Sequence, residues 1–316
     1  MKFLRSLWQQ QRLLMIVALL HIGLIPVVAL LFFLNPVEIT GVDGWVKPLK
    51  FAISGAIYAA SIAWMATLLP TTSRWYKLAS GTIAVALFIE TALITLQVVR
   101  GTTSHYNIST PLDTTIYSLM ATFISMLATA NIICLFVIVR QKAIPSLMRI
   151  ACGWGLAIAF VGMIAGVLMT SVNVSPSQRH TMQVDKHAPT SYGAHSVGVD
   201  DGGPGLPLLG WSTVGGDLRV GHFVGLHGLQ LLPLLGLALL SGRLIGRQSS
   251  SQHQQFLHLV GIAYTALTIF LIWQAWRGQS LIAPDLVSIS CAGVIVVGTI
   301  IATLSILRDN AQTPPA

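Results

Sequence analysis

The sequence is poor in charged residues. Only 9% of its 316 residues are Asp, Glu, Lys or Arg, whereas water-soluble proteins carry about 25%. Acidic residues are especially scarce, with 10 Asp and Glu against 18 Lys and Arg. The hydrophobic share is 54% and the mean hydropathy is +0.74. This combination excludes a soluble globular domain and predicts an integral membrane protein.

Cysteine is also rare, and several familiar motifs are missing. The three cysteines, Cys134, Cys152 and Cys291, all fall within apolar stretches. We therefore expect them to pack as small apolar side chains, without a disulfide framework or a metal-ligand spacing. The sequence contains no P-loop, no Rossmann glycine pattern and no GxSxG elbow. Their absence argues against a nucleotide-driven pump and against an elbow-type serine hydrolase.

Eight apolar runs are long enough to cross the hydrocarbon core of a bilayer, which takes about 20 helical residues. They are residues 13–34, 48–69, 77–99, 114–139, 149–171, 219–241, 256–276 and 285–307. The first run is too long for a signal peptide and lacks a cleavage site, so we interpret it as a retained helix. The predicted fold is an all-α polytopic membrane bundle of about eight transmembrane helices. It forms a single integral membrane domain over 1–309, with a disordered tail at 310–316.

The net charge of +8 has an explanation in membrane topology. If the N-terminus is cytoplasmic, most Lys and Arg residues lie on the cytoplasmic side, as the positive-inside rule requires. We therefore expect both termini in the cytoplasm. The bilayer is then the partner that the positive charge indicates, and no nucleic-acid partner is expected.

One outer segment is much longer than the others. Residues 172–216 are rich in glycine and proline towards their end, which rules out a long regular element. Long loops in compact proteins tend to be lids or binding loops. We expect this loop to cover the outer ends of the helices.

A duplication is a further hypothesis. Gln97, Arg100 and Gly101 precede an aspartate at Asp113, and the stretch from Gln274 to Asp285 repeats the pattern with Arg277 and Gly278. These matches suggest a four-plus-four parallel repeat, as some transporters have. Chance similarity is the alternative.

Polar residues from separate segments converge on the predicted outer side. Helix 219–241 carries Arg219, His222, His227 and Gln230 within an arc of about 140°, with glycines opposite. Glu90 lies within an apolar run, where an acid suggests function by default. The residues predicted to line an outward-facing ligand-binding cavity are Lys47, Lys50, Glu90, Arg100, His105, Asp113, Asp217, Arg219, His222, His227, Gln230 and Arg277. A plain structural alternative has His222 and His227 bonded to backbone carbonyls.

Three chemistries fit such a cavity. Cations at helix ends favour an anionic or amphiphilic small molecule or lipid, bound by a carrier or a receptor. A b-type haem between His21 and His227 is the second alternative. A zinc hydrolase using His105, His222 and His227 with Asp113 or Asp217 is the third, although histidines five residues apart do not share a helix face. Whether the protein is an enzyme stays open.

Four motifs carry a resemblance to a known family. They are RGTTSHYNISTPLD (100–113), the stretch 193–230 ending in GWSTVGGDLRVGHFVGLHGLQ, WVKPLKF (45–51) and WRGQSLIAPD (276–285). With these motifs the chain resembles a family of uncharacterised bacterial multi-pass inner-membrane proteins. The resemblance implies a location in the bacterial cytoplasmic membrane and no particular activity.

Overall fold

The computed structural model describes residues 2–70, 73–171, 173–185, 190–241 and 250–308. Within these residues, eight helices are long and apolar enough to cross a membrane, and each overlaps one of the predicted runs. They are α2 (Arg12–Leu34), α3 (Val46–Ala66), α4 (Arg74–Val99), α5 (Pro111–Arg140), α6 (Ser146–Ser171), α8 (Leu218–Leu240), α9 (Ser250–Trp276) and α10 (Leu286–Arg308). The all-α polytopic membrane bundle is thus confirmed. The tail predicted at 310–316 lies outside the described residues.

Side-chain caps fix where the site-bearing helices begin. The Thr110 hydroxyl accepts a hydrogen bond from the Asp113 backbone amide, and Pro111 occupies the first turn of α5. The Asp217 carboxylate accepts from the Arg219 amide at the start of α8. Both arrangements satisfy amides that would otherwise lack partners at a helix N-terminus.

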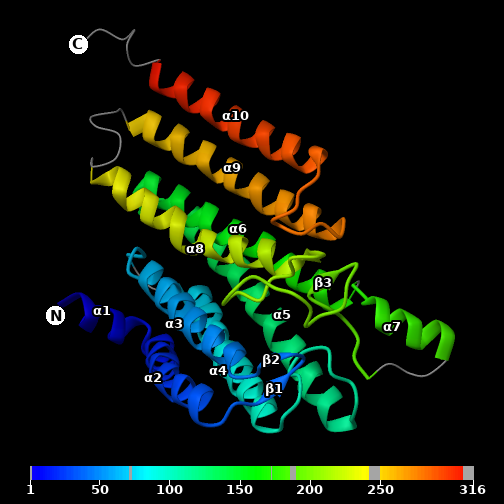
Figure 1. Ribbon diagram of the computed structural model, residues 1–316. Coiled ribbons are helices and arrows are strands. Elements are labelled where there is room, and N and C mark those ends of the chain that lie inside the picture. The colour runs from blue at the N-terminus through cyan, green and yellow to red at the C-terminus, as the bar shows by residue number, and fades with distance from the viewer. Residues whose placement is uncertain (1, 71–72, 172, 186–189, 242–249, 309–316) are drawn as a thin grey trace, which may run out of the picture.

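The helices form two packed groups joined in the middle of the molecule. The helix α2 packs against α3 and α4, while α6 packs against α8 and α9. Between the groups, α5 contacts both α4 and α6, and α10 packs chiefly on α9 at one edge (Figure 1). Within the apolar stretch of each helix, 56% of α6 is buried inside the protein and 0% of α10. The centre of the bundle therefore lies at α6, and α10 turns most of its surface outward.

Glycines let α8 approach its neighbours closely. A Cβ atom on Gly225 would lie 2.5 Å from the Gly162 Cα atom of α6, and one on Gly221 would lie 2.5 Å from the Ile272 side chain of α9. Small residues at helix contacts are how membrane helices pack without a hydrophobic driving force. The glycine face of α8 therefore packs inside the bundle.

The connections that carry the predicted site lie at one end of the bundle, called here the loop end. It comprises residues 35–45, 100–110, 173–217 and 277–285, apart from those not described (Figure 1). The long segment holds only short elements: α7 (Pro176–His180), a π-helical turn (Thr181–Asp185), and strands β3 (Ser196–Val197) and β4 (Gly216–Asp217), which pair antiparallel. A second two-residue pair joins β1 (Glu38–Ile39) to β2 (Val42–Asp43). The short helix α1 (Lys2–Gln10) lies at the opposite end.

Candidate functional site

The turn after α4 positions a histidine over the end of the bundle. Gly101 adopts a φ of 69°, a conformation that suits glycine. The Gln97 side-chain amide then donates to the Thr103 carbonyl at 3.3 Å, which holds the chain close to the helix end. The following residues, Ser104 and His105, are thereby directed back towards the interior.

His105 connects an acid to a base. Its Nε2 atom lies 3.3 Å from Glu90 Oε1 on α4, and its Nδ1 atom lies 3.1 Å from Lys47 Nζ on α3. The Ser104 hydroxyl is also 3.0 Å from Nδ1. Lys47 has only hydrogens to donate, so Nδ1 accepts, and the neutral ring carries its proton on Nε2, the nitrogen that lies beside Glu90 Oε1. We call Glu90, His105 and Lys47 the polar triad.

The triad is nearly closed to its surroundings. The Glu90 side chain is 5% exposed and the His105 side chain 19%. Burial and the neighbouring charge of Lys47 hold the pKa of His105 well below its ordinary value. The second oxygen of Glu90, Oε2, is buried and has no hydrogen-bond partner among the described residues. A buried acceptor without a partner costs free energy, so this oxygen marks a place where a donor would be stabilised.

A second acid–base pair covers the triad from the long segment. His195 Nδ1 lies 2.7 Å from Asp201 Oδ2, and the Tyr106 ring packs edge-on against the His195 ring at 5.0 Å between centroids. Burial lowers the pKa of His195. Burial alone would raise the pKa of Asp201, but its hydrogen bonds from the His195 ring and from backbone amides outweigh it and lower that pKa. The pair thus joins an imidazole whose pKa is lowered by burial to a carboxylate whose pKa is lowered by its hydrogen bonds.

The three predicted arginines differ from the expectation of free cations. Each is paired with an aspartate: Arg100 with Asp113 at 2.6 Å, Arg219 with Asp217, and Arg277 with Asp285 at 2.6 Å. Asp217 precedes α8 as its cap, so the Arg219 pair spans only two residues. These arginines stabilise helix ends, and their charge is compensated locally.

The two predicted lysines have different partners. Lys47 contacts the His105 ring, and Lys50 donates to the backbone carbonyl of Leu209 at 2.8 Å. In the described part of the chain, neither ammonium group has a carboxylate oxygen within 4.0 Å. Arg219 also donates to the Gly210 carbonyl at 2.6 Å. Two carbonyls of the long segment are thus tied to α3 and α8.

The remaining predicted residues follow α8 away from the loop end. His222 and His227 hydrogen-bond through Nδ1 to the backbone carbonyls of Gly162 and Phe223, at 2.9 and 2.8 Å. This agrees with the structural alternative given above. Gln230 donates to the Ser61 hydroxyl at 3.2 Å and so links α8 to α3. His227 and Gln230 do not contact the polar triad.

The haem and zinc alternatives receive no support from these contacts. Both ring nitrogens of His21 are engaged, with the Val17 carbonyl at 2.8 Å and the Thr91 hydroxyl at 2.9 Å. Iron would have to displace one of these partners. Among the described residues, no group of three His, Cys, Asp or Glu side chains is arranged to hold a metal ion.

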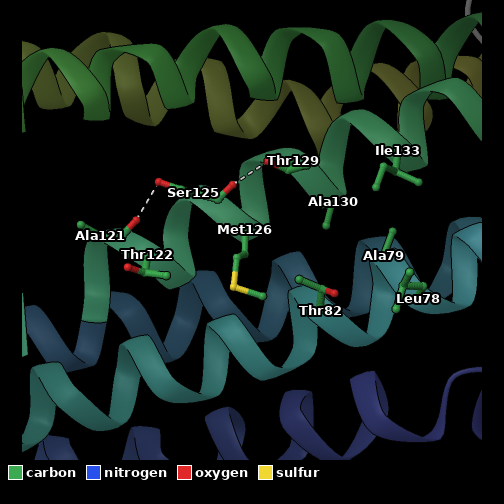
Figure 2. Close-up of a pocket in the computed structure, with 10 residues that line it drawn as sticks. All are labelled: Leu78, Ala79, Thr82, Ala121, Thr122, Ser125, Met126, Thr129, Ala130 and Ile133. Carbon is green, nitrogen blue, oxygen red and sulfur yellow. Dashed lines mark hydrogen bonds between the residues drawn. The ribbon is translucent and has the colours of Figure 1, made fainter. Parts of the chain in front are cut away.

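A groove of about 660 Å³ lies between α4 and α5, away from the triad (Figure 2). A stripe of hydroxyls on α5, those of Thr122, Ser125 and Thr129, lines it. Each donates to the carbonyl four residues earlier in its own helix, at 2.7 to 3.0 Å. The stripe satisfies its own hydrogen bonds, and the groove is apolar in character.

Comparison with known proteins adds no relative. No protein-family model matches the chain, no curated protein has a similar sequence, and no solved structure has a matching fold. The site therefore rests on its own geometry.

Proposed function

We propose that the protein is a carrier or receptor of the bacterial inner membrane that binds an anionic or amphiphilic small molecule or lipid. The ligand contacts the polar triad and Lys50 at the loop end. The observation that carries this proposal is made on the described residues: Glu90 Oε2 lacks a hydrogen-bond donor, and the nearby Lys47 ammonium group lacks a carboxylate partner. Such groups are stabilised by a ligand that supplies both a donor and a negative charge.

The anionic character of the ligand follows from the lysines. Arg100, Arg219 and Arg277 are compensated by aspartates, whereas Lys47 and Lys50, one helical turn apart on α3, have no carboxylate partner among the described residues and are the cations proposed to meet the ligand. A phosphate or carboxylate forms charge-assisted hydrogen bonds with ammonium groups. A hydroxyl or amine on the same ligand suits Glu90 Oε2.

The site is proposed to open outward. The positive-inside rule favours both termini in the cytoplasm, and the loop end then faces the outside. The similar turns at Gln97–Asp113 and Gln274–Asp285 support the four-plus-four parallel repeat. In both, the glutamine amide donates to the carbonyl six residues later, at 3.3 Å for Thr103 and 3.2 Å for Ser280.

A thermal-shift experiment tests the binding. The full-length protein in a mild neutral detergent is heated with dodecyl phosphate or with an uncharged dodecyl glycoside. We expect dodecyl phosphate to raise the melting temperature, because a ligand that binds the folded state stabilises it. The Lys47→Met variant should lose the shift, and Arg277→Met should keep it. An equal shift in both variants, or none in the native protein, contradicts the proposal.

A further inference from the structure

The polar triad forms a continuous chain of polar contacts between two depths of the bundle. Lys47 is the second residue of α3, at the loop end, and Glu90 lies about 14 Å below the end of α4 by the rise of a helix. His105 links them through its two different ring nitrogens, at 3.1 and 3.3 Å. A side chain that accepts on one nitrogen and donates from the other can pass a proton across its ring.

We propose that Lys47, His105 and Glu90 form a proton relay between the solution at the loop end and the buried carboxylate. The Lys47 ammonium gives a proton to His105 Nδ1, and the proton on Nε2 passes to Glu90 Oε1. Lys47 becomes a neutral amine, His105 becomes its other neutral tautomer, and Glu90 becomes a neutral acid. Lys47 then takes a proton from solution, so that the site has gained one proton. Release runs in reverse: Lys47 first loses a proton to solution, then accepts the proton of His105 Nδ1, while Glu90 returns its proton to Nε2.

The surroundings of Glu90 favour such an exchange over a fixed ion pair. Its Oε2 atom is buried and has no hydrogen-bond partner in the part of the chain that the structure describes. An ionised carboxylate in an apolar medium is costly unless it is fully paired. Transfer of one proton replaces two buried charges with two neutral groups. A purely structural ion pair would be expected to satisfy both carboxylate oxygens.

Other charged and titratable groups face the relay from every neighbouring segment. His195 and Asp201 approach from the long segment, and His222 and Arg219 approach from α8. Arg219 and Asp201 are each held by a partner of opposite charge or by hydrogen bonds. The chain of direct contacts reaching Glu90 therefore runs through His105.

The relay depends on the proposed function for its purpose, since it would couple ligand binding to proton uptake. Its test needs no ligand, so the two proposals can fail separately. A dodecyl phosphate shift without proton transfer would leave the binding proposal standing. Proton transfer without the shift would leave the relay standing.

Infrared spectroscopy of the full-length protein reads the relay directly. A protonated carboxyl group gives a carbonyl band that shifts when its proton is replaced by deuterium. We expect a pH-dependent band that disappears in Glu90→Gln and remains in Asp285→Asn. In Lys47→Met the band should persist to higher pH, because the neighbouring positive charge no longer favours the carboxylate.

The rate of deuterium exchange distinguishes a relay from an isolated buried acid. After transfer into heavy water, the Glu90 band should shift at least about tenfold more slowly in His105→Phe, because the positioned proton carrier is missing. His105→Asn serves as a second variant if the phenylalanine perturbs folding. The proposal is overturned if both variants exchange as fast as the native protein, or if no band depends on Glu90.

Discussion

The two ends Gln97–Asp113 and Gln274–Asp285 are built alike, but only one of them carries a polar site. We call them the first and second corners. Each begins at a glutamine whose amide holds the turn, continues through a glycine with a φ of 69° or 75°, and closes with an arginine–aspartate pair. As turns between membrane helices, the two are equivalent.

The corners differ in how deeply their aspartates are buried and in the polar residues around them. The Asp113 side chain of the first corner is 3% exposed, and the Asp285 side chain of the second is 37% exposed. The first corner has a longer loop, which holds His105. Seven residues before its glutamine lies Glu90, whereas the same position in the second corner is Leu267, an exposed apolar residue. The shared turn is therefore a structural element, and the inserted histidine and intramembrane acid make the first corner a candidate site.

The largest expected effect comes from reversing the charge of Glu90, which the first corner contacts through His105. Glu90→Lys should lower the free energy of unfolding by about 3 kcal/mol or more, because it leaves an unpaired charge buried beside Lys47. Glu90→Gln should be tolerated far better. Thermal melting in detergent measures both, with the exposed Glu38→Lys as control. Equal tolerance of Gln and Lys at position 90 would mean that this side chain meets water freely.

Removing the aspartate should destabilise the protein more at the first corner, where the ion pair is buried, than at the second, where it is exposed. Asp113→Asn leaves the half-buried Arg100 without its carboxylate and should cost about 3 kcal/mol, the lower range for breaking a buried ion pair. Asp285→Asn should change stability little, because water already solvates that pair. Denaturation of the two variants under identical conditions gives the comparison. Equal losses would show that the corners are held by the same forces.

Acid should destabilise the first corner through its histidine. The pKa of His105 in the folded protein lies well below its ordinary value of 6.5. Below about pH 6.5 the unfolded chain therefore binds a proton that the folded chain does not, and stability falls by up to about 1.4 kcal/mol per pH unit for this residue. His105→Gln should flatten the melting temperature against pH in this range. A curve that keeps its slope would assign the effect to other groups, such as His195.

The smallest change in stability is expected at the glycine that both corners share. Gly101→Ala and Gly278→Ala each place a side chain on a backbone with positive φ, which costs roughly 1–2 kcal/mol. A Cβ on Gly101 would meet nothing within 4 Å, and one on Gly278 would meet only the Val197 carbonyl at 3.7 Å. Similar losses in melting temperature are expected. A much larger loss at one glycine would mean that the two turns are not equivalent.

The sequence predicts the helices well, because apolar runs of about 20 residues leave few alternatives in a membrane. It also places the polar residues at one end. The pairing of Glu90 with His105 could not be predicted, since it depends on how residues 100–110 fold back over α4. The structure places the histidine between Lys47 and the acid.

The arginine–aspartate pairs could have been predicted from the positions of the aspartates at the starts of helices, but not from composition. Asp217 directly precedes α8, which is the typical position of a capping aspartate, so its carboxylate is held within reach of Arg219. Likewise, Asp113 lies in the first turn of α5, close to the end of α4. Helix boundaries known to one or two residues would have predicted these pairs. The His195–Asp201 pair lies in an irregular segment, where no periodicity guides prediction.

The central claim is that the polar triad and Lys50, beside the first corner, form a ligand site open to the outside. Thiol labelling of intact cells tests it most directly. Lys50→Cys and the second-corner control Leu286→Cys are each introduced after replacement of Cys134, Cys152 and Cys291. A membrane-impermeant maleimide is then applied with and without dodecyl phosphate. The account predicts that both cysteines react from outside and that dodecyl phosphate slows only the reaction at position 50. Failure of both to react, or an equal rate at position 50 with and without dodecyl phosphate, would contradict it.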